Sequence, residues 1–349
     1  MKKLYVETGR PYEILIERGL LKKSGELVKS VSKAVRAAVI SDSNVMKLYG
    51  DTVVNSLKEN GFITTAFEFE AGESSKRLST IEKMYSHLAD NGFTRKDIIV
   101  ALGGGVTGDM AGFCAATFLR GIDFVQIPTS LLAQVDSSVG GKTGVDISQG
   151  KNLVGSFWQP NLVIIDPDTL STLPKKFICD GMAEVIKYGC IKDKALFEKL
   201  ESENALDIIE DVIYNCVSIK RDVVSRDERD TGERALLNFG HTLGHALEKL
   251  YGYSGLTHGQ GVAIGMVMMT KASENKGATE KNTADRIACL CKKYGLPTGD
   301  SHSFEQIAKA TSGDKKSSGR QIELVILDKI GESHRHLINQ SDICDYITV

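Results

Sequence analysis

The fold is decided by the stretch Asp97-Ile-Ile-Val-Ala-Leu-Gly-Gly-Gly-Val-Thr-Gly-Asp109. Its first half is a short, almost continuous apolar run, which is typical of a β-strand covered on both faces. Its second half has the spacing G-x-G-x-x-G between that strand and an expected helix, and glycines there let a phosphate approach the N–H groups at a helix N-terminus. A tight structural turn is the alternative, because the usual nucleotide fingerprint lies in the first βα unit of its domain.

Strand-like and helix-like stretches alternate around this motif. Short runs rich in β-branched residues lie at residues 12–17, 37–41, 65–69, 124–127 and 162–166, and helical patterns occupy residues 45–59 and 80–89. Such alternation predicts an α/β domain with a mostly parallel sheet flanked by helices, of the Rossmann-like kind that binds nucleotides. We expect this domain to span residues 1–173.

The pattern changes after Leu173-Pro174. Helical patterns, several of them ended by glycine or proline, occupy residues 177–200, 205–227, 234–251, 259–274 and 283–294. One late strand is expected at residues 321–327. Residues 174–349 are therefore predicted to form a second, α-helical domain.

The composition excludes several classes of protein. The chain has 42% hydrophobic residues, 25% charged residues and a net charge of -2, which gives no electrostatic reason to bind nucleic acid or an anionic membrane. It contains no run of about eighteen apolar residues, and its first residues lack the apolar stretch of a signal peptide. We therefore expect a cytoplasmic protein that captures any anionic ligand through local groups.

A polar stripe is expected in the second domain. Arg234, Asn238, His241 and His245 follow one another at spacings of four, three and four, so on one helix they would lie within roughly 80° of a single face. A solvated helix face is the usual explanation of such a pattern. However, two glycines flank His241, each costing a helix about 1 kcal/mol relative to alanine. They suggest that something approaches the backbone closely, and the stripe is a candidate for metal, anion or proton chemistry.

Two further residues, Glu184 and His258, could complete a metal site with this stripe. Glu184 and Lys187 are three apart in a small, apolar helical segment, and His258 stands just before another expected helix. One carboxylate and two imidazoles are a common ligand set for catalytic zinc. The spacing leaves open which two histidines would bind, and a surface ion pair and a capping histidine are the alternatives. Thr242 stands where zinc proteases with the motif H-E-x-x-H have a glutamate, so that activity is excluded.

Two other groups of residues suit a phosphate or a nucleotide. Lys142, Lys151 and Asn152 lie in a glycine-rich stretch, which can form a compact anion site. Asp42 and Asn44 lie just beyond an expected strand, where open α/β sheets commonly contact ribose or adenine. Flexible surface loops, caps and turns are the alternatives.

Taken together, these segments resemble the 3-dehydroquinate synthase family of sugar-phosphate cyclases. The matching stretches are residues 103–109, 128–146, 150–152, 181–187, 234–245, 258–259 and 314–316. The resemblance implies an N-terminal domain that binds NAD+, a helical C-terminal domain that binds a metal and most of the substrate, and an active site between them. It also implies a homodimer in which Arg120 reaches the partner's site.

The resemblance assigns roles to residues at matching positions. It implies Zn2+, or Co2+ in its place, held by Glu184, His241 and His258, and it makes His245 a carrier of protons. The residues assigned to NAD+ are Asp42, Asn44, Glu73, Lys76, Gly104, Gly105, Val106, Asp109, Thr129, Ser130, Asp136, Lys142, Lys151, Thr169 and Thr172.

The remaining assignments concern a small sugar phosphate as substrate. Arg234 and Lys220 would hold its carboxylate. Its phosphate would be bound by Lys142, Asn152, the partner's Arg120 and a lysine of the pair Lys315 and Lys316. Its hydroxyl groups would be contacted by Asp136, Lys187 and Asn238, and catalysis would involve these three residues with Lys142 and His245.

The implied reaction converts 3-deoxy-D-arabino-heptulosonate 7-phosphate to 3-dehydroquinate and phosphate, a step of the shikimate pathway. A hydride passes from C5 to NAD+, phosphate is eliminated, the hydride returns, and ring opening and an intramolecular aldol closure complete the carbocycle, so the net reaction is that of a lyase. Zinc serves as a Lewis acid, and clamps on both anionic groups orient the substrate. One departure is Gln260, where many members of the family carry glutamate, and it bears on the surroundings of the metal.

Three other functions share parts of this pattern. A metal-dependent polyol dehydrogenase similar to glycerol dehydrogenase would release NADH and would not need clamps for both a carboxylate and a phosphate, so Arg234, Lys142 and Asn152 argue against it. Other sugar-phosphate cyclases act on substrates without a carboxylate. A catalytically silent nucleotide-binding protein would have lost ligands or bases, whereas Glu184 and the histidines are present.

Overall fold

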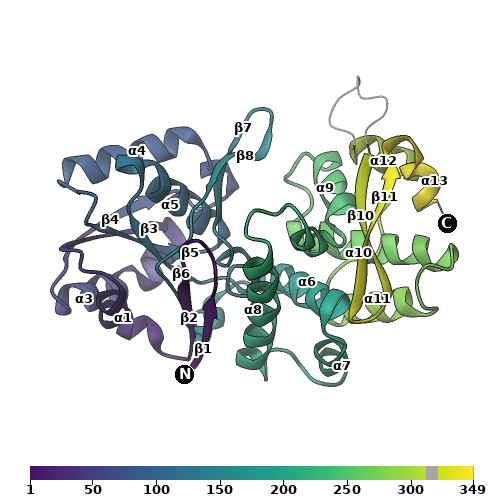
Figure 1. Cartoon of the computed structure of the whole chain (residues 1–349), viewed down its shortest axis with the longest axis horizontal. Coiled ribbons are helices and arrows are strands. Elements are labelled where there is room, and N and C mark those ends of the chain that lie inside the picture. Colours follow the sequence, from purple (N-terminus) through teal and green to yellow (C-terminus); the bar gives the residue numbers. More distant parts are fainter. Residues whose placement is uncertain (312–320, 349) are drawn as a thin grey trace. The chain divides into compact units, whose positions relative to one another are not determined.

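The chain folds into two compact units. The computed structural model describes residues 1–311 and 321–348, so Lys315 and Lys316 lie outside the described residues. The first unit contains Met1–Leu173 together with Lys220–Arg229, and the second contains Pro174–Ile219 and Asp230–Val349 (Figure 1). The sequence-based division gave residues 220–229 to the second domain. In the structure they pack with the first unit, where Nζ of Lys220 donates a hydrogen bond of 2.7 Å to the carbonyl of Asp136.

A seven-stranded sheet organises the first unit. Its strands lie in the order β1 (Lys2–Val6), β2 (Tyr12–Ile16), β9 (Leu162–Ile165), β6 (Asp123–Pro128), β5 (Ile98–Gly103), β3 (Arg36–Asp42) and β4 (Ile63–Phe69). Strand β1 is antiparallel to β2, and all other neighbours are parallel. The predicted α/β fold with a mostly parallel sheet is confirmed. Strand β1 is an addition that the sequence patterns did not indicate.

Helices cover both faces of this sheet because side chains of successive strand residues enter two different cores. On one face, Val39 packs with α1 (Ser24–Val31) and α3 (Asp51–Glu59). On the other face, Ile40 packs with α4 (Leu78–Asp90) and α5 (Gly105–Thr117). Since neighbouring side chains of a strand point to opposite faces, the continuous apolar runs in the sequence are what a sheet buried on both sides requires.

The glycine-rich stretch after β6 contains a β-hairpin, an element that the sequence patterns did not indicate. Strands β7 (Lys142–Ile147) and β8 (Gly150–Phe157) pair antiparallel, with Gly144 opposite Gly155. A Cβ atom at Gly155 would lie 2.2 Å from the carbonyl oxygen of Thr143. The glycines therefore mark a close approach of two backbones, which composition alone does not distinguish from a loop.

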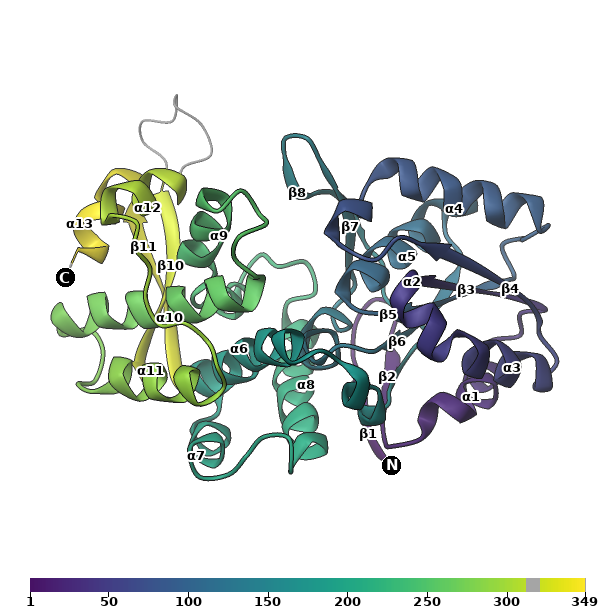
Figure 2. The same cartoon turned by 180° about the vertical axis from the view of Figure 1, so that it is seen from behind.

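Helices dominate the second unit (Figure 2). They are α6 (Lys175–Lys192), α7 (Lys194–Ser202), the first part of α8 (Ile209–Arg226), α9 (His241–Leu250), α10 (His258–Asn275), α11 (Thr283–Lys293), α12 (Phe304–Thr311) and α13 (Ile343–Ile347). The predicted late strand is β10 (Gln321–Lys329), and it pairs antiparallel with β11 (Glu332–Asn339), which was not predicted. Within the described ranges, no helix combines the length and the apolar character that a membrane span needs.

The stripe from residue 234 to residue 245 does not lie on one helix, so that expectation is wrong. Residues Glu233–Asn238 form a short 3-10 helix, η7, and α9 begins afresh at His241. Between them Gly240 has a φ of 80°, a left-handed conformation that breaks a right-handed helix. The groups before and after Gly240 therefore reach their surroundings from two elements.

The glycines around His241 let two helix backbones touch. A Cβ atom at Gly265 of α10 would lie 2.0 Å from the carbonyl oxygen of Gly240. A Cβ atom at Gly244 of α9 would lie 2.9 Å from the carbonyl carbon of Gly261. The close approach suggested by the cost of these glycines is therefore observed, and it brings the first turns of α9 and α10 together.

We expect Gly265→Ala to destabilise the protein by about 1–3 kcal/mol, because the added methyl group has no space beside rigid backbone. Gly299→Ala is the matched control, since no atom lies within 4 Å of a Cβ placed there. Thermal unfolding of both variants measures the difference. An unchanged midpoint for Gly265→Ala would contradict the packing of α9 against α10.

Candidate active site

Three helices of the second unit bring the predicted metal ligands together. Glu184 lies within α6, while His241 and His258 are the first residues of α9 and α10. Oε1 of Glu184 lies 3.4 Å from Nε2 of His241 and 3.3 Å from Nε2 of His258. One potential ligand atom from each residue lies within 4.8 Å of the others. The spacing argument left the two histidines open, and this pair is the one that meets Glu184.

Glu184 is a buried anion whose oxygens point into this cluster. Its side chain has an exposed fraction of 0%, and Oε2 forms an ion pair with Nζ of Lys187, which is buried as well. Burial raises the pKa of Glu184, but the charge of Lys187 and the imidazole of His241 outweigh burial and hold this pKa well below its usual value. Among the described residues, no donor makes a well-directed hydrogen bond to either carboxylate oxygen. The carboxylate thus retains capacity to bind a cation, and the donor set fits a divalent metal such as zinc.

Each imidazole of the cluster turns the same nitrogen toward Glu184. Nδ1 of His241 lies 3.1 Å from the carbonyl oxygen of Phe239, which can accept a hydrogen bond from it. Nε2 is then the nitrogen that can bind a metal. Nδ1 of His258 lies 3.6 Å from Oε2 of Glu248. Burial lowers the pKa of His258, but the carboxylates of Glu184 and Glu248 outweigh it and raise this pKa to about 10. Before a metal binds, His258 is therefore a cation at neutral pH.

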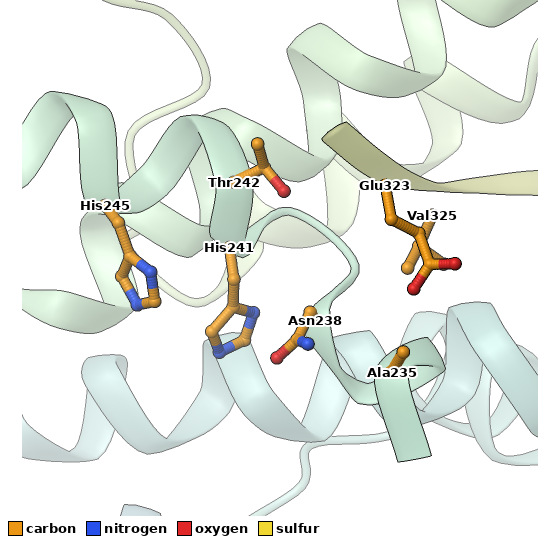
Figure 3. Close-up of a pocket in the computed structure, with 7 residues that line it drawn as sticks. All are labelled: Ala235, Asn238, His241, Thr242, His245, Glu323 and Val325. Atoms are coloured by element: carbon orange, nitrogen blue, oxygen red, sulfur yellow. The ribbon is translucent and has the colours of Figure 1, made fainter. Parts of the chain in front are cut away.

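A small pocket adjoins the cluster (Figure 3). Its volume is about 250 Å³, and it is lined by Ala235, Asn238, His241, Thr242, His245, Glu323 and Val325. His241 and His245 project from α9 toward the same side, with Asn238 beside them. Glu323 comes from β10 and pairs with Nε of Arg335 at 2.6 Å. Sequence reasoning missed Glu323 because it reaches the pocket from a strand distant in the chain.

The remaining residues predicted in this unit have different surroundings. The side chain of His245 has an exposed fraction of 60%, and its ring stacks against that of His258 at a centroid distance of 5.8 Å. Arg234 lies in η7 and is buried. His245 is therefore an exposed group of α9, whereas Arg234 is a buried group of η7.

Gln260 proves to be part of a helix cap. Its Oε1 accepts a hydrogen bond of 3.1 Å from the backbone N–H of Thr257, and the hydroxyl of Thr257 accepts one from the N–H of Gln260. This capping box fixes the start of α10, where His258 stands. Because the side chain of glutamate can make the same contact, the departure at Gln260 preserves the placement of His258.

Asp180 of α6, which sequence reasoning also missed, anchors the same helix start. Its Oδ1 accepts a hydrogen bond from the hydroxyl of Thr257. A Cβ atom at Gly259 would lie 2.4 Å from Cα of Asp180. The first turn of α10 is therefore pressed against α6, which carries Glu184.

In the first unit, residues predicted to bind the nucleotide lie at the point where the strand order reverses. Strand β3 has β4 on one side and β5 on the other, and Ser41 of β3 pairs with Leu102 of β5. Asp42 and Gly103 therefore end adjacent strands, and Gly104 caps α5. Such a switch point is where open α/β sheets bind ligands.

Other residues assigned to the nucleotide lie on neighbouring segments. The carboxylate of Asp42 accepts hydrogen bonds from the N–H groups of Asn44 and Val45. Thr129 and Ser130 follow β6, and the N–H of Thr129 donates to the carbonyl of Gly103 at 3.0 Å. Thr169 accepts from Gln134, and the hydroxyl of Thr172 lies 2.5 Å from that of Tyr49. Val106 lies in the first turn of α5, next to Gly105.

A buried lysine joins residues predicted to bind different ligands. Nζ of Lys76 donates to Asp109 at 2.7 Å and to Oδ1 of Asn152 at 2.6 Å. Burial lowers the pKa of Lys76, but Asp109 and Glu73 outweigh it and raise this pKa. Burial also raises the pKa values of Glu73 and Asp109. The structure thus connects Asn152, assigned to the substrate phosphate, with three residues assigned to the nucleotide.

The other predicted residues of this unit are more dispersed. Asp136 forms an ion pair with Lys220, so two residues far apart in the sequence do meet. Lys142 is exposed at the start of β7, and Lys151 is half-buried in β8. Arg120 is exposed and has a φ of 68°.

Metal binding is expected to release about one proton from His258 at pH 8. The pKa of about 10 keeps His258 protonated in the metal-free protein, and a metal can bind only after that proton has left. With an ordinary histidine pKa of about 6.5, the release would be under about 0.1 proton. Calorimetric titration of the metal-free protein with Zn2+ in buffers of different ionisation enthalpy measures the number. The release should persist to about pH 9, and its absence between pH 7.5 and pH 9 would contradict the coupling of His258 to the two carboxylates.

Comparison with known proteins gives a consistent result. The family model for the N-terminal part of 3-dehydroquinate synthase matches residues 66–180, and the model for the C-terminal part matches residues 181–317. The 3-dehydroquinate synthase of Clostridium botulinum is 49% identical, covering 95% of this chain and 97% of its own. That of Clostridium perfringens is 51% identical, covering 93% and 94%.

Solved structures agree with the sequence comparisons. A 2-deoxy-scyllo-inosose synthase in complex with carbaglucose-6-phosphate, NAD+ and Co2+ is 25% identical, with a TM-score of 0.87 over 99% of both chains. A 2-epi-5-epi-valiolone synthase from Streptomyces hygroscopicus with NAD+ and Zn2+ is 25% identical, with a TM-score of 0.85 over 96% and 95%. Glycerol dehydrogenase from Schizosaccharomyces pombe has a TM-score of 0.65 at 19% identity and shares the fold. With relatives close to half identical over nearly its whole length, the chain belongs to the 3-dehydroquinate synthase family.

Proposed function

We propose that this chain converts 3-deoxy-D-arabino-heptulosonate 7-phosphate to 3-dehydroquinate and phosphate. The observation that carries the proposal is the meeting of Glu184, His241 and His258 beside a pocket that also presents Asn238 and His245. Family membership supports the same reaction. The chain is thus an enzyme of the phosphate-eliminating lyase class that serves the shikimate pathway.

We assign the metal to Glu184 and to the Nε2 atoms of His241 and His258. Two similar solved structures contain NAD+ together with Co2+ or Zn2+. When bound, the metal supplies Lewis acidity and NAD+ supplies reversible oxidation. Lys187 balances the charge of Glu184 within the buried cluster, and together with His241 it keeps the pKa of this carboxyl group well below its usual value.

The roles of the polar groups at the pocket follow from their burial and neighbours. His245 is exposed enough to exchange protons with water, and its stacking on His258 holds it beside the metal ligands. We assign it the transfer of protons to and from the substrate. Asn238 lines the pocket from η7 and offers both a donor and an acceptor to hydroxyl groups.

We assign the anionic groups of the substrate to the basic residues expected from the sequence. Arg234 and Lys220 are proposed for the carboxylate, and Lys142 and Asn152 for the phosphate. Arg234 lies in η7 and is buried, and its planar guanidinium suits bidentate contact with a carboxylate. The hydrogen bond of Asn152 to Lys76 supports a fixed orientation for this amide.

The nucleotide is assigned to the switch point of the first unit. Asp42 at the end of β3 is proposed for the ribose, and Gly104, Gly105 and Val106 at the start of α5 for the pyrophosphate. This assignment is supported by the N-terminus of α5, where backbone N–H groups and the helix dipole favour an anion.

We also propose a cytoplasmic homodimer. In the part of the chain that the structure describes, no disulfide joins any of the seven cysteines, which is typical of a reducing compartment. Arg120 is exposed in a left-handed conformation at the end of a 3-10 turn, so its side chain is available to a second copy of the chain. We assign it the role of completing the phosphate site of that copy.

The full-length protein, loaded with Zn2+ and given the heptulosonate phosphate with substoichiometric NAD+, should release phosphate and dehydroquinate in equal amounts over many turnovers per NAD+. The reason is that the cofactor is oxidised again in every cycle. Phosphate, dehydroquinate and NADH are followed together. Steady accumulation of NADH would indicate a polyol dehydrogenase, and phosphate release without dehydroquinate would overturn the assigned product.

A further inference from the structure

Glu248, one turn beyond His245 on α9, has no role in the assignments above. Its side chain has an exposed fraction of only 5%, and its Oε2 lies 3.6 Å from Nδ1 of His258 and 3.9 Å from Nε2 of His245. Residues three and four apart share a helix face, so His241, His245 and Glu248 follow one face of α9. A buried carboxylate is costly unless it is paired, and two imidazoles of the site are among the groups near the carboxylate of Glu248.

We propose that Glu248 is a positioning residue of the metal centre, which holds the ring of His258 so that Nε2 faces the ion. The inference rests on the proposed metal site and adds a residue to it. A histidine that binds a metal through one nitrogen commonly donates its other N–H to a carboxylate or a carbonyl, and this partner fixes the tautomer and the ring orientation.

The two histidines of the cluster have different oxygen atoms beside Nδ1. His241 has the carbonyl of Phe239 beside its Nδ1, because the chain turns at Gly240 immediately before it. His258 stands at the beginning of α10, where the side chains of Thr257 and Gln260 form a capping box by accepting hydrogen bonds from each other's backbone N–H groups. The oxygen that lies beside Nδ1 of His258 comes from another element, because it belongs to Glu248 of α9.

The close contact between α9 and α10 makes this pairing possible. Gly244, between the two histidines of α9, allows backbone contact with Gly261 of α10. Glu248 lies one turn further along α9 and remains near the start of α10, so its short side chain reaches His258. Glu248 thus acts on the ion through His258.

A second metal site is the competing explanation, because ligand atoms of His245, Glu248 and His258 also lie within 4.8 Å of one another. A neutral imidazole keeps a hydrogen on one of its two nitrogens. Nε2 of His258 is already directed at Glu184. To hold a second ion through Nδ1, His258 would have to lose that last hydrogen, whereas a carboxylate partner uses it. The geometry therefore favours one ion for each chain.

The test compares metal binding by the full chain and by Glu248→Ala and Glu248→Gln. Metal-free protein is titrated with Zn2+ against a chromogenic chelator, and the visible spectrum of bound Co2+ reports the ligand geometry. We expect Glu248→Ala to bind Zn2+ about 10–100-fold more weakly and to change the Co2+ spectrum. Glu248→Gln should lie between, because an amide oxygen can accept the Nδ1 hydrogen but carries no charge.

Glu274→Gln is the matched control. Glu274 is a half-buried glutamate of α10 that accepts a hydrogen bond of 2.6 Å from the N–H of Ala284 and is not part of either histidine cluster. It should bind both metals as the unmodified chain does. An equal loss in Glu274→Gln would show that the effect is general weakening of the helices, and would overturn the proposal.

Two further results would overturn it. One is unchanged affinity and Co2+ spectrum in both Glu248 variants. The other is two zinc ions bound by each unmodified chain, with one lost in Glu248→Ala, which would make Glu248 a ligand. Glu184→Gln separates this inference from the proposed function: if Glu184→Gln keeps its zinc, the assigned metal site itself is wrong, whereas loss of zinc there leaves the Glu248 result to decide the positioning role alone.

Discussion

The packing of α6, α9 and α10 in the second unit depends on the carboxylate of Glu184, because a buried charge costs several kcal/mol unless it is paired. Its partners come from three helices: Lys187 on α6, His241 on α9 and His258 on α10. Each histidine must direct its Nε2 atom toward Glu184, so the starts of α9 and α10 have to be placed accurately. The contacts of this one carboxylate with a lysine and two imidazoles thus connect the packing of the helices to the chemistry of the site.

The backbone provides that placement in two ways. Glycines remove the side chains that would separate the helices, as at Gly244 against Gly261 and at Gly259 against Asp180. Defined starts then fix where each histidine stands: the left-handed Gly240 precedes His241, and the capping box of Thr257 precedes His258. In the first unit the backbone also provides the placement, since the pairing of β3 with β5 brings the end of β3 at Asp42 beside the glycine turn.

The sequence predicted those parts that depend on local pattern. The apolar runs gave the parallel strands, and the cost of glycines around His241 gave the close approach of α9 to its neighbour. The sequence failed where conformation depends on the surroundings: a glycine in a helical pattern became a left-handed break at Gly240, and a glycine-rich stretch became a hairpin at residues 142–157. Glu323 was missed because only the three-dimensional fold brings it to the pocket. The choice of His258 over His245 as the second partner of Glu184 also needed the fold, and the resemblance to a known family anticipated it.

We propose that two neighbouring histidines of α9 have different roles, with His241 holding the metal and His245 moving protons. Metal content and turnover of His241→Ala and His245→Ala, measured on the same preparations, test it most directly. The account predicts that His241→Ala loses its zinc, while His245→Ala keeps one zinc ion in each chain and turns over about 100-fold or more slowly. Equal loss of metal from both variants would contradict the division.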